Sequence, residues 1–406
     1  MRKNFHKAFL LLSLAGFISF NPPQNEDELL KKKKAEELAH KFIIVDGHVD
    51  LPYRLHGKME DVSVQTTAGD FDYVRAKKGG LSAPFMSIYV PSKLQQTPGD
   101  SKALADSLID MVENLTTQFP DKFALAKSPA DIEKNFRKGL ISLPMGMENG
   151  SPIESNLANL DHFYKRGIRY ITLCHGENNL ICDSSYDTTS TWQGLSPYGR
   201  KVVLEMNKLG IMIDCSHISD NTFEQVVKMS KAPVIASHSS CRFFTPGFQR
   251  NMSDEMITML AQKNGVIMIN FASSFLDETA NNYSKNKAAE VAKWAKEHNV
   301  AVNSPEARAF DEEYSKNQPM KLTNVEKVAD HIDHVVKLAG ITHVGLGSDF
   351  EGVGPTLPDG LKDCSQLPNL IYILLKRGYS ENDIQKICYQ NIFRVWKDVE
   401  KVARKM

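Results

Sequence analysis

The triplet His48-Val49-Asp50 places an imidazole and a carboxylate two residues apart. Successive side chains of an extended segment point to opposite sides, so His48 and Asp50 share one side. Imidazole nitrogen and carboxylate oxygen are good ligands for Zn²⁺ and similar divalent cations. Such a triplet also arises often by chance, and its histidine could be an ordinary core residue. The triplet is therefore a candidate for part of a metal site that needs further ligands.

Three more potential ligands end apolar runs farther along the chain: Glu148, His217 and His238. Burying several such groups costs free energy unless something pairs with them, and a metal ion is the simplest partner. Glu148 is the acid of this set placed to bridge two ions about 3.5–4 Å apart, as in two-metal hydrolases. The alternative for Glu148 is a helix N-cap or a salt bridge to an arginine. The full set of ligands favours the bridge.

Asp349 lies in the glycine-rich stretch Gly345-Leu346-Gly347-Ser348-Asp349-Phe350-Glu351-Gly352, where backbone and ligand can approach closely. A carboxylate near the metals that is not consumed as a ligand could accept a proton from a metal-bound water and pass it to a leaving nitrogen. The alternative is that Asp349 is another ligand. Both interpretations place it in the site.

The elements that must position these residues are short apolar runs alternating with amphipathic segments, which is typical of βα units and a parallel sheet. We expect eight strands, at 42–45, 83–90, 140–147, 168–173, 210–215, 233–237, 266–271 and 343–347. Several are continuously apolar, as strands covered on both faces should be. Helices are expected to start near Ser219, Ser253 and Asn324, each of which is followed by an acidic residue within the first turn. The pattern predicts an α/β fold, a (β/α)8 barrel.

Seven polar side chains lie at the ends of these predicted strands. His48 and Asp50 follow the first, Glu148 ends the third, His175 the fourth, His217 the fifth and His238 the sixth, and Asp349 follows the eighth. In a (β/α)8 barrel these positions converge on the C-terminal face, where the active sites of this fold lie. His331 and His334 are also close in sequence, but they precede the eighth strand on a helix of the outer ring. We expect them to pack there.

The bulk composition is that of an ordinary globular protein, with 42% hydrophobic and 24% charged residues. Lysine plus arginine equals aspartate plus glutamate, 49 against 49, so no global field favours nucleic acid. The segment 272–322 is polar, carries no strand signal and is expected to be a partly helical insertion after the seventh strand. No composition shift marks a second domain, so the barrel is predicted to span 23–406. The six cysteines do not reveal a pairing.

The first 22 residues resemble a signal peptide, with a basic start and an apolar run over 8–20. The run is short for a membrane span, although an uncleaved anchor is the alternative. Phe17 stands where a lipoprotein signal would have its cysteine, and the C-terminus lacks the tail of a GPI signal. We expect an exported protein, periplasmic or extracellular, whose mature form has no stable membrane span. The oligomeric state stays open, a homodimer included.

Several motifs together resemble the membrane (renal-type) dipeptidases, a family within the amidohydrolase-like metal barrels. The similarity runs from about residue 42 to 396, apart from the insertion. The matching stretches begin at Asp46, Gly79, Met145, Ile213, Ser237, Gly345 and Gly378. Their order along the chain is that of the family.

The resemblance implies a role for each matching residue. His48 and Asp50 would bind one Zn²⁺, His217 and His238 a second, and Glu148 would bridge the two. His175 would steady the tetrahedral intermediate, Arg250 would hold the substrate, and Asp349 would shuttle the proton. The flanks of His175 and the spacing before Arg250 fit the family less well. The implied activity is hydrolysis of dipeptides by a hydroxide that bridges two zinc ions.

Two other classes of function remain to be weighed. A different binuclear hydrolase on the same barrel, such as a lactonase or cyclic amide hydrolase, often bridges its metals with a carbamylated lysine, and Glu148 argues against that. A non-catalytic binding protein would be expected to have lost ligands, whereas all five and Asp349 are present. Side-chain preference and tolerance of D-residues in the substrate are not determined by the sequence.

Overall fold

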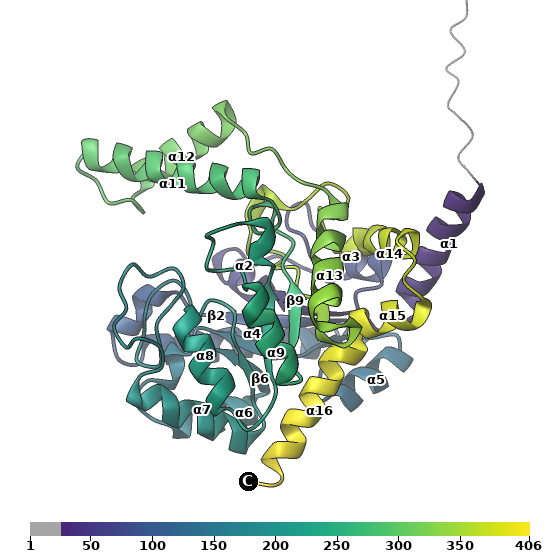
Figure 1. Ribbon diagram of the computed structural model, residues 1–406, viewed down its shortest axis with the longest axis horizontal. Helices are drawn as coiled ribbons and strands as arrows, with labels where there is room; N and C mark the ends of the chain where they lie inside the picture. Colours follow the sequence, from purple (N-terminus) through teal and green to yellow (C-terminus); the bar gives the residue numbers. More distant parts are fainter. Residues whose placement is uncertain (1–25) are drawn as a thin grey trace, which may run out of the picture.

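In a computed structural model, which describes residues 26–406, eight parallel strands close into a barrel surrounded by helices (Figure 1). The order around the barrel is β1-β10-β9-β8-β7-β6-β5-β2. The barrel strands are β1 (Val45–Val49), β2 (Ala83–Tyr89), β5 (Met145–Glu148), β6 (Ile168–Thr172), β7 (Met212–Asp214), β8 (Val234–Ser239), β9 (Val266–Ile269) and β10 (Val344–Leu346). The predicted (β/α)8 barrel is confirmed.

Helices follow most of the barrel strands and cover the outside of the barrel. They are α1 (Glu26–Lys41), α2 (Leu51–Gly57), α3 (Tyr73–Gly79), α4 (Asp100–Gln118), α5 (Pro129–Arg137), α6 (Ala158–Arg166), α7 (Pro197–Leu209), α8 (Asp220–Met229), α9 (Asp254–Gln262), α10 (Ser273–Leu276), α11 (Glu278–Glu297), α12 (Pro305–Asn317), α13 (Val325–Ala339), α14 (Leu367–Lys376), α15 (Glu381–Gln385) and α16 (Asn391–Ala403). The predicted starts of α8, α9 and α13 are confirmed. The side chains of Ser219, Ser253 and Asn324 each accept a hydrogen bond from a backbone N–H of the first turn.

Two of the predicted strands differ from the observed ones. The first runs over 45–49 instead of 42–45, so His48 lies within β1 and not after it. The prediction was wrong because residues 42–44 are apolar and buried like a strand but precede β1. The third predicted strand is divided at Pro144, which has no N–H to donate. Its first part is β4 (Ile141–Leu143), which pairs with β3 (Phe123–Leu125) in a separate two-stranded sheet.

The N-terminal end of the barrel is filled by apolar side chains. Phe85 of β2 and Tyr170 of β6 lie in one core with Trp396 and Phe393 of α16. The ring centroids of Phe85 and Trp396 are 5.4 Å apart, and Trp396 is fully buried. Helix α16 thus covers the N-terminal end of the barrel, opposite the C-terminal ends of the strands.

Between β9 and α13 the chain forms α10, α11 and α12 and no strand. Helices α11 and α12 lie side by side and extend beyond the barrel (Figure 1). They share a small core of Val291, Ala295 and Ala307, against which Trp294, Val300 and Phe310 pack. This core is separate from the cores of the barrel.

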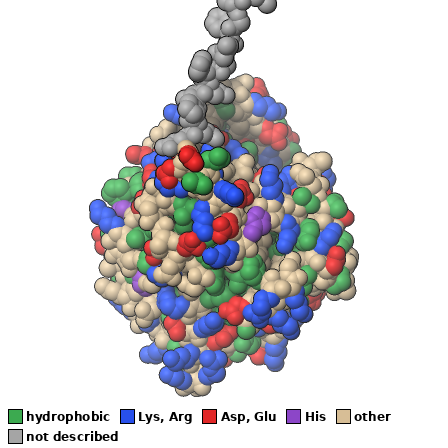
Figure 2. Space-filling model, turned by 90° about the vertical axis from the view of Figure 1, so that its right-hand side faces the viewer, with side chains coloured by type: hydrophobic (Ala, Val, Ile, Leu, Met, Phe, Trp, Pro, Cys, Tyr) green, Lys and Arg blue, Asp and Glu red, His purple; other side chains and the backbone are tan. Residues whose placement is uncertain are grey.

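Lysine, arginine and acidic side chains are interspersed over the face shown in Figure 2, in line with the net charge of zero. On α1, Lys34 and Lys41 both pair with Glu381, at 2.8 and 3.1 Å. The four consecutive lysines of α1, Lys31–Lys34, are therefore part of a mixed-charge helix surface. Within 26–406, no helix combines the length and the apolar character that crossing a bilayer requires. The predicted signal peptide, over 1–22, lies outside the described residues.

Candidate metal centre

Two barrel strands have an irregular register with a neighbouring strand, and each irregular stretch carries a histidine toward the C-terminal end of the barrel. The register between β1 and β2 shifts between Asp46 and Val49, and that between β8 and β9 shifts between Ala236 and Ser239. His48 and His238 lie within these two irregular stretches. Such bulges redirect side chains and recur beside active sites.

Left-handed backbone places further side chains of the site. The φ angles of His217 and Asp349 are +70° and +65°, and those of Asn149 and Glu351 are +81° and +70°. A non-glycine residue in this region costs of order 1–3 kcal/mol, and such residues cluster at functional sites. All four follow the C-terminal ends of barrel strands β5, β7 and β10. The turns that carry candidate ligands are thus strained, and the surrounding fold holds them.

The two oxygens of Glu148 face two different sets of side chains. Oε2 lies 3.2 Å from Nε2 of His48, which is 3.5 Å from Oδ2 of Asp50. Oε1 lies 3.0 Å from Nε2 of His217 and 3.3 Å from Nε2 of His238. The carboxylate therefore divides the other four groups into one pair on each of its oxygens. This is the arrangement that a carboxylate bridging two metal ions requires.

The donor set fits divalent cations. Nε2 of His48 and Oδ1 of Asp50 are buried and have no hydrogen-bond partner among the described residues. Ligand atoms of His48, Glu148 and His238 lie within 4.8 Å of one another, and the same holds for Glu148, His175 and His217 and for His48, Asp50 and Asp349. Imidazole and carboxylate ligands without thiolates suit Zn²⁺ and neighbouring metals of the first row.

The charge state of the centre also favours a cation. Burial by itself would raise the pKa of Glu148, but His48, His175 and the hydrogen bonds from His217 and His238 hold it well below its usual range. Burial lowers the pKa values of His217 and His238 well below the ordinary value. Burial by itself would lower the pKa of His48, but Tyr170, Glu148 and Asp50 hold it well above the ordinary value. The ionised carboxylate of Glu148 beside the neutral rings of His217 and His238 is the protonation state in which these three groups bind metal.

Asp349 is a buried carboxyl at the edge of the centre. Burial raises its pKa to about 7, the charge of His48 opposes this rise, and the charges of Asp50 and Glu148 add to it. Its Oδ2 accepts a hydrogen bond of 2.7 Å from Nδ2 of Asn270. A carboxyl with a pKa near neutrality can both take and give a proton. Its place beside His48 and Asp50 is compatible with either predicted role, proton shuttle or ligand.

The two residues expected to act on the substrate lie in different positions. His175 lines the cavity in front of the centre, with its ring 4.3 Å from that of His217 and 4.8 Å from that of Tyr89. Arg250 is buried, and it donates to Oγ of Ser239 at 2.7 Å and to the carbonyl of His238 at 2.9 Å. Its guanidinium lies over the ring of Phe275. His175 thus lines the cavity directly, whereas Arg250 lies behind it, in contact with one of its lining residues, Phe275.

The cavity has a volume of about 550 Å³ and contains residues that the sequence did not single out. They are Tyr53, Tyr89, Tyr186, Phe275 and Glu351. Tyr89 and Glu351 lie inside stretches that match the family, and this match is the sequence feature that could have identified them. Tyr53, Tyr186 and Phe275 come from three different segments, and nothing in their local sequence marks them. The aromatic lining makes the cavity a pocket for an organic ligand over a polar floor.

The histidines of α13 have packing roles, as expected. Nδ1 of His331 accepts a hydrogen bond from the backbone N–H of Cys241, so its Nε2 donates to the carbonyl of Leu276. His334 pairs with Asp254 at 2.8 Å. The six cysteines are all buried and unpaired.

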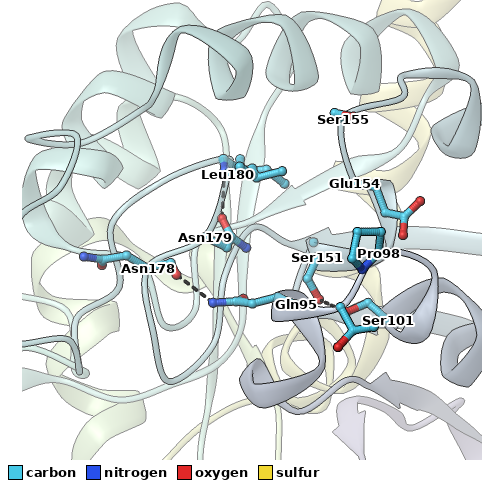
Figure 3. A pocket seen from close by; sticks show the side chains of 12 residues that line it. Gln95, Pro98, Ser101, Ser151, Glu154, Ser155, Asn178, Asn179 and Leu180 are labelled. Atoms are coloured by element: carbon cyan, nitrogen blue, oxygen red, sulfur yellow. Dashed lines mark hydrogen bonds between the residues drawn. The ribbon is translucent and has the colours of Figure 1, made fainter.

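A second cavity, of about 380 Å³, lies among the loops that follow β2, β5 and β6 (Figure 3). Gln95 donates to the carbonyl of Asn178, and Ser151 to Oγ of Ser101. The amide of Asn179 is used by four internal hydrogen bonds, to Asn149, Leu173, Ile181 and Cys182. These groups brace the loops. Among the described residues, the clusters of metal-binding side chains all lie at the first cavity.

Comparison with known proteins gives concordant matches over most of the chain. The membrane dipeptidase family (peptidase family M19) matches residues 32–406. Dipeptidase verJ of Clonostachys rogersoniana is 34% identical over 386 residues, which cover 92% of this chain and 88% of that protein. The probable dipeptidase PvdM from Pseudomonas aeruginosa has a TM-score of 0.81 at 27% identity, covering 92% of this chain and 100% of that one. A metallo peptidase from Rhodobacter sphaeroides, solved with a phosphinate mimic of the dipeptide L-Ala-D-Ala, has a TM-score of 0.71 at 25% identity, covering 88% and 99%.

Proposed function

The chain belongs to the membrane dipeptidase family, peptidase family M19, as a dipeptide hydrolase, and we propose that it works with two Zn²⁺ ions bridged by Glu148. His48 and Asp50 would bind one ion, and His217 and His238 the other. The observation that carries the proposal is the division of these four groups between the two oxygens of Glu148. The buried, unpartnered Nε2 of His48 and Oδ1 of Asp50 support it, since each needs a partner that the protein does not supply.

Two bound zinc ions would polarise the scissile carbonyl and lower the pKa of a water molecule toward neutrality, so that hydroxide is available as the nucleophile. The protein supplies the remaining chemistry. Asp349, with a pKa raised to about 7, would accept a proton from the nucleophilic water and return it to the leaving amine. His175, which lines the cavity, would donate a hydrogen bond to the oxyanion. Burial lowers the pKa of His175, so a neutral ring would be the donor.

Substrate binding is proposed to involve Arg250 and the aromatic wall. The fork of a guanidinium can hold a substrate oxygen through two hydrogen bonds. One N–H of each terminal nitrogen of Arg250 is used within the protein, by Ser239 and by the carbonyl of His238, and Nε is buried with no partner among the described residues. A guanidinium carries five N–H groups, so Arg250 would still offer N–H donors and a positive charge to the substrate. The Rhodobacter sphaeroides relative was solved with a mimic of L-Ala-D-Ala, so L-D dipeptides are included among the substrates to test.

The alternative of a lactonase or cyclic amide hydrolase has less support. Enzymes of that group often bridge their metals through a carbamylated lysine, whereas Glu148 occupies the position between the histidines here. We also propose that the chain is exported by its first 22 residues, on the composition of that segment alone.

The test is a dipeptide panel, including L-D pairs, assayed with zinc-reconstituted protein whose metal content is measured. We expect release of amino acids, about two zinc ions per chain and loss of activity with a chelator. His238→Ala should lose activity together with metal. His162→Ala, at a part-exposed histidine of α6 that pairs with Asp106, is the matched control and should retain both. An inactive His238→Ala protein with full zinc content would contradict the ligand assignment.

A further inference from the structure

We propose that two hydroxyl groups, those of Tyr170 and Ser237, are positioning groups that fix the ring orientation and tautomer of His48 and His238. The inference rests on the proposed function, because it concerns how these two histidines present Nε2 to the metal ions. It adds Tyr170, Ser237 and Asp214 to the residues on which metal binding depends.

Tyr170 lies under His48. Its hydroxyl oxygen is 2.9 Å from Nδ1 of His48 and 3.0 Å from the carbonyl oxygen of Gly47. A phenol has one hydrogen, and a carbonyl can only accept, so that hydrogen goes to Gly47. The oxygen of Tyr170 must then accept a hydrogen from Nδ1 of His48. The remaining nitrogen, Nε2, has its lone pair free on the side of Glu148.

The ring of Tyr170 has no freedom to move away. A Cβ atom on Gly146 would lie 2.0 Å from its Cζ, so the ring rests directly on the backbone of β5. Phe85 packs against it with a centroid distance of 5.3 Å, and Tyr170 is fully buried. A rigid ring gives its hydroxyl a fixed position, which in turn fixes the plane of His48.

Ser237 does the same for His238. Its Oγ is 2.7 Å from Nδ1 of His238 and 2.6 Å from Oδ2 of Asp214. The carboxylate of Asp214 also accepts from Oγ1 of Thr172 and from the backbone N–H groups of Ser216 and Ser237. Because Asp214 is surrounded by donors, the hydroxyl of Ser237 donates to it and accepts from Nδ1 of His238. Nε2 of His238 is then the nitrogen without a hydrogen, and it lies 2.9 Å from Nε2 of His217, which must be the donor in that contact.

The two arrangements serve different halves of the centre. His48 lies beside Oε2 of Glu148, and His238 lies beside Oε1. His217, the other histidine beside Oε1, has a buried Nδ1 for which the described residues supply no hydrogen-bond partner. A hydroxyl group therefore orients one histidine beside each oxygen of Glu148: Tyr170 orients His48, and Ser237 orients His238. Partners of this kind raise the basicity of a metal-binding imidazole and keep it from rotating.

The experiment compares Tyr170→Phe and Ser237→Ala with the wild type. Each variant removes one hydroxyl oxygen and keeps the rest of the side chain. Zinc affinity is measured by chelator competition, zinc content by elemental analysis, and the visible spectrum after substitution with Co²⁺ reports the ligand geometry. We expect each variant to bind one of the two ions about 10- to 100-fold more weakly and the other ion nearly as wild type. The Co²⁺ spectrum should change accordingly.

Two controls separate positioning from general stability. Tyr198→Phe and Ser92→Ala make the same chemical changes at buried hydroxyls that have no hydrogen-bond partner within 26–406, and they should bind both ions as the wild type does. The melting temperature of each metal-free variant shows whether the fold itself is weakened. Ser237→Ala remains informative if Tyr170→Phe does not fold, and the reverse also holds.

The outcomes distinguish the inference from the proposed function. If the wild type binds no metal ion, the proposed function fails, and the inference fails with it. If the wild type binds two ions and both variants bind them with unchanged affinity and an unchanged Co²⁺ spectrum, the proposed function stands and the positioning role is wrong. An equal loss of affinity in Tyr198→Phe or Ser92→Ala would also overturn it.

Discussion

The raised pKa of Asp349 makes the stability of the metal-free protein depend on pH. An exposed aspartate in the unfolded chain has a pKa of about 3.9, whereas burial raises that of folded Asp349 to about 7. The folded state therefore binds this proton more tightly than the unfolded state does. As the pH rises from about 4 to about 7, the unfolded state loses its proton first, and the free energy of unfolding falls. Above about pH 7 the loss is complete.

Asp349→Asn removes this titration from the buried site. We expect the metal-free variant to exceed the metal-free wild type in free energy of unfolding at pH 8, by roughly 1–3 kcal/mol. The difference should be smaller at pH 4.5, where folded Asp349 keeps its proton. Urea unfolding in the presence of a chelator at both pH values measures it. Glu351 and Asp46, whose pKa values burial raises to about 7 and about 6, titrate in both proteins and cancel. A stabilisation that is larger at pH 4.5 than at pH 8 would contradict the assignment.

At the residue scale, the sequence identified the groups with metal chemistry because their type is readable directly. It did not identify Tyr170, Ser237 or Asp214, which lie inside apolar strands and look like core residues. Their role depends on which side chain stands opposite them in the barrel, and neighbours in sequence do not specify that. His238 and Ser237 are adjacent in the chain, yet the acceptor of Ser237 comes from β7.

At the scale of elements, α11 and α12 form a helical hairpin that is stabilised by a small core of its own. Trp294 packs against Phe310, with a centroid distance of 5.1 Å, and against His298 at 4.0 Å. The residues of this small core belong to neither of the barrel cores. Segments with few contacts to the main core can open locally without global unfolding.

Trp294→Ala is expected to loosen the hairpin and leave the barrel intact. Trp294 is half-buried, so its loss should cost less than the roughly 3–5 kcal/mol of a fully buried aromatic side chain, but it removes the largest side chain that packs on this small core. Trypsin should cleave within 278–317 much faster in the variant, as followed by mass spectrometry. The main thermal transition should move by less than about 2 °C, because the barrel cores are unchanged. Trp192→Ala, in the loop after β6, is the matched control, and cleavage of the hairpin at the wild-type rate in Trp294→Ala would count against local stability.

At the scale of the whole molecule, α16 joins the end of the chain to the first strands of the barrel. Trp396 packs on Phe85 of β2 in a core that also contains Val45 of β1 and Met268 of β9. Segments more than 300 residues apart in the chain are thus held in one core at the N-terminal end of the barrel. The polar centre at the other end depends on this core, because the strands that carry its residues start there.

Trp396→Ala should therefore destabilise the entire barrel. We expect the free energy of unfolding of the metal-free protein to fall by about 3–5 kcal/mol, in a single transition seen equally by fluorescence and circular dichroism. In the part of the chain that the structure describes, the indole N–H of Trp396 has no hydrogen-bond partner, which places the expected cost toward the lower end of that range. Trp294→Ala is the matched comparison, because the same substitution is expected to destabilise only the α11–α12 hairpin there and the entire barrel here. A cost below about 1 kcal/mol would show that α16 does not secure the barrel.

The sequence by itself determined the fold class, the family and the residue types at the ends of the strands. These features are local: apolar runs, helix caps and short motifs depend on residues close together in the chain. The tertiary structure decided the register of β1, the division of the third predicted strand at Pro144, the aromatic wall of the cavity and the partners of His48 and His238. It also brought the candidate metal-binding residues together, with His48 beside one oxygen of Glu148 and His217 and His238 beside the other. The physical reason is that strand register and side-chain convergence come from packing between distant segments and from strained turns, such as those at His217 and Asp349, that only the closed barrel can hold.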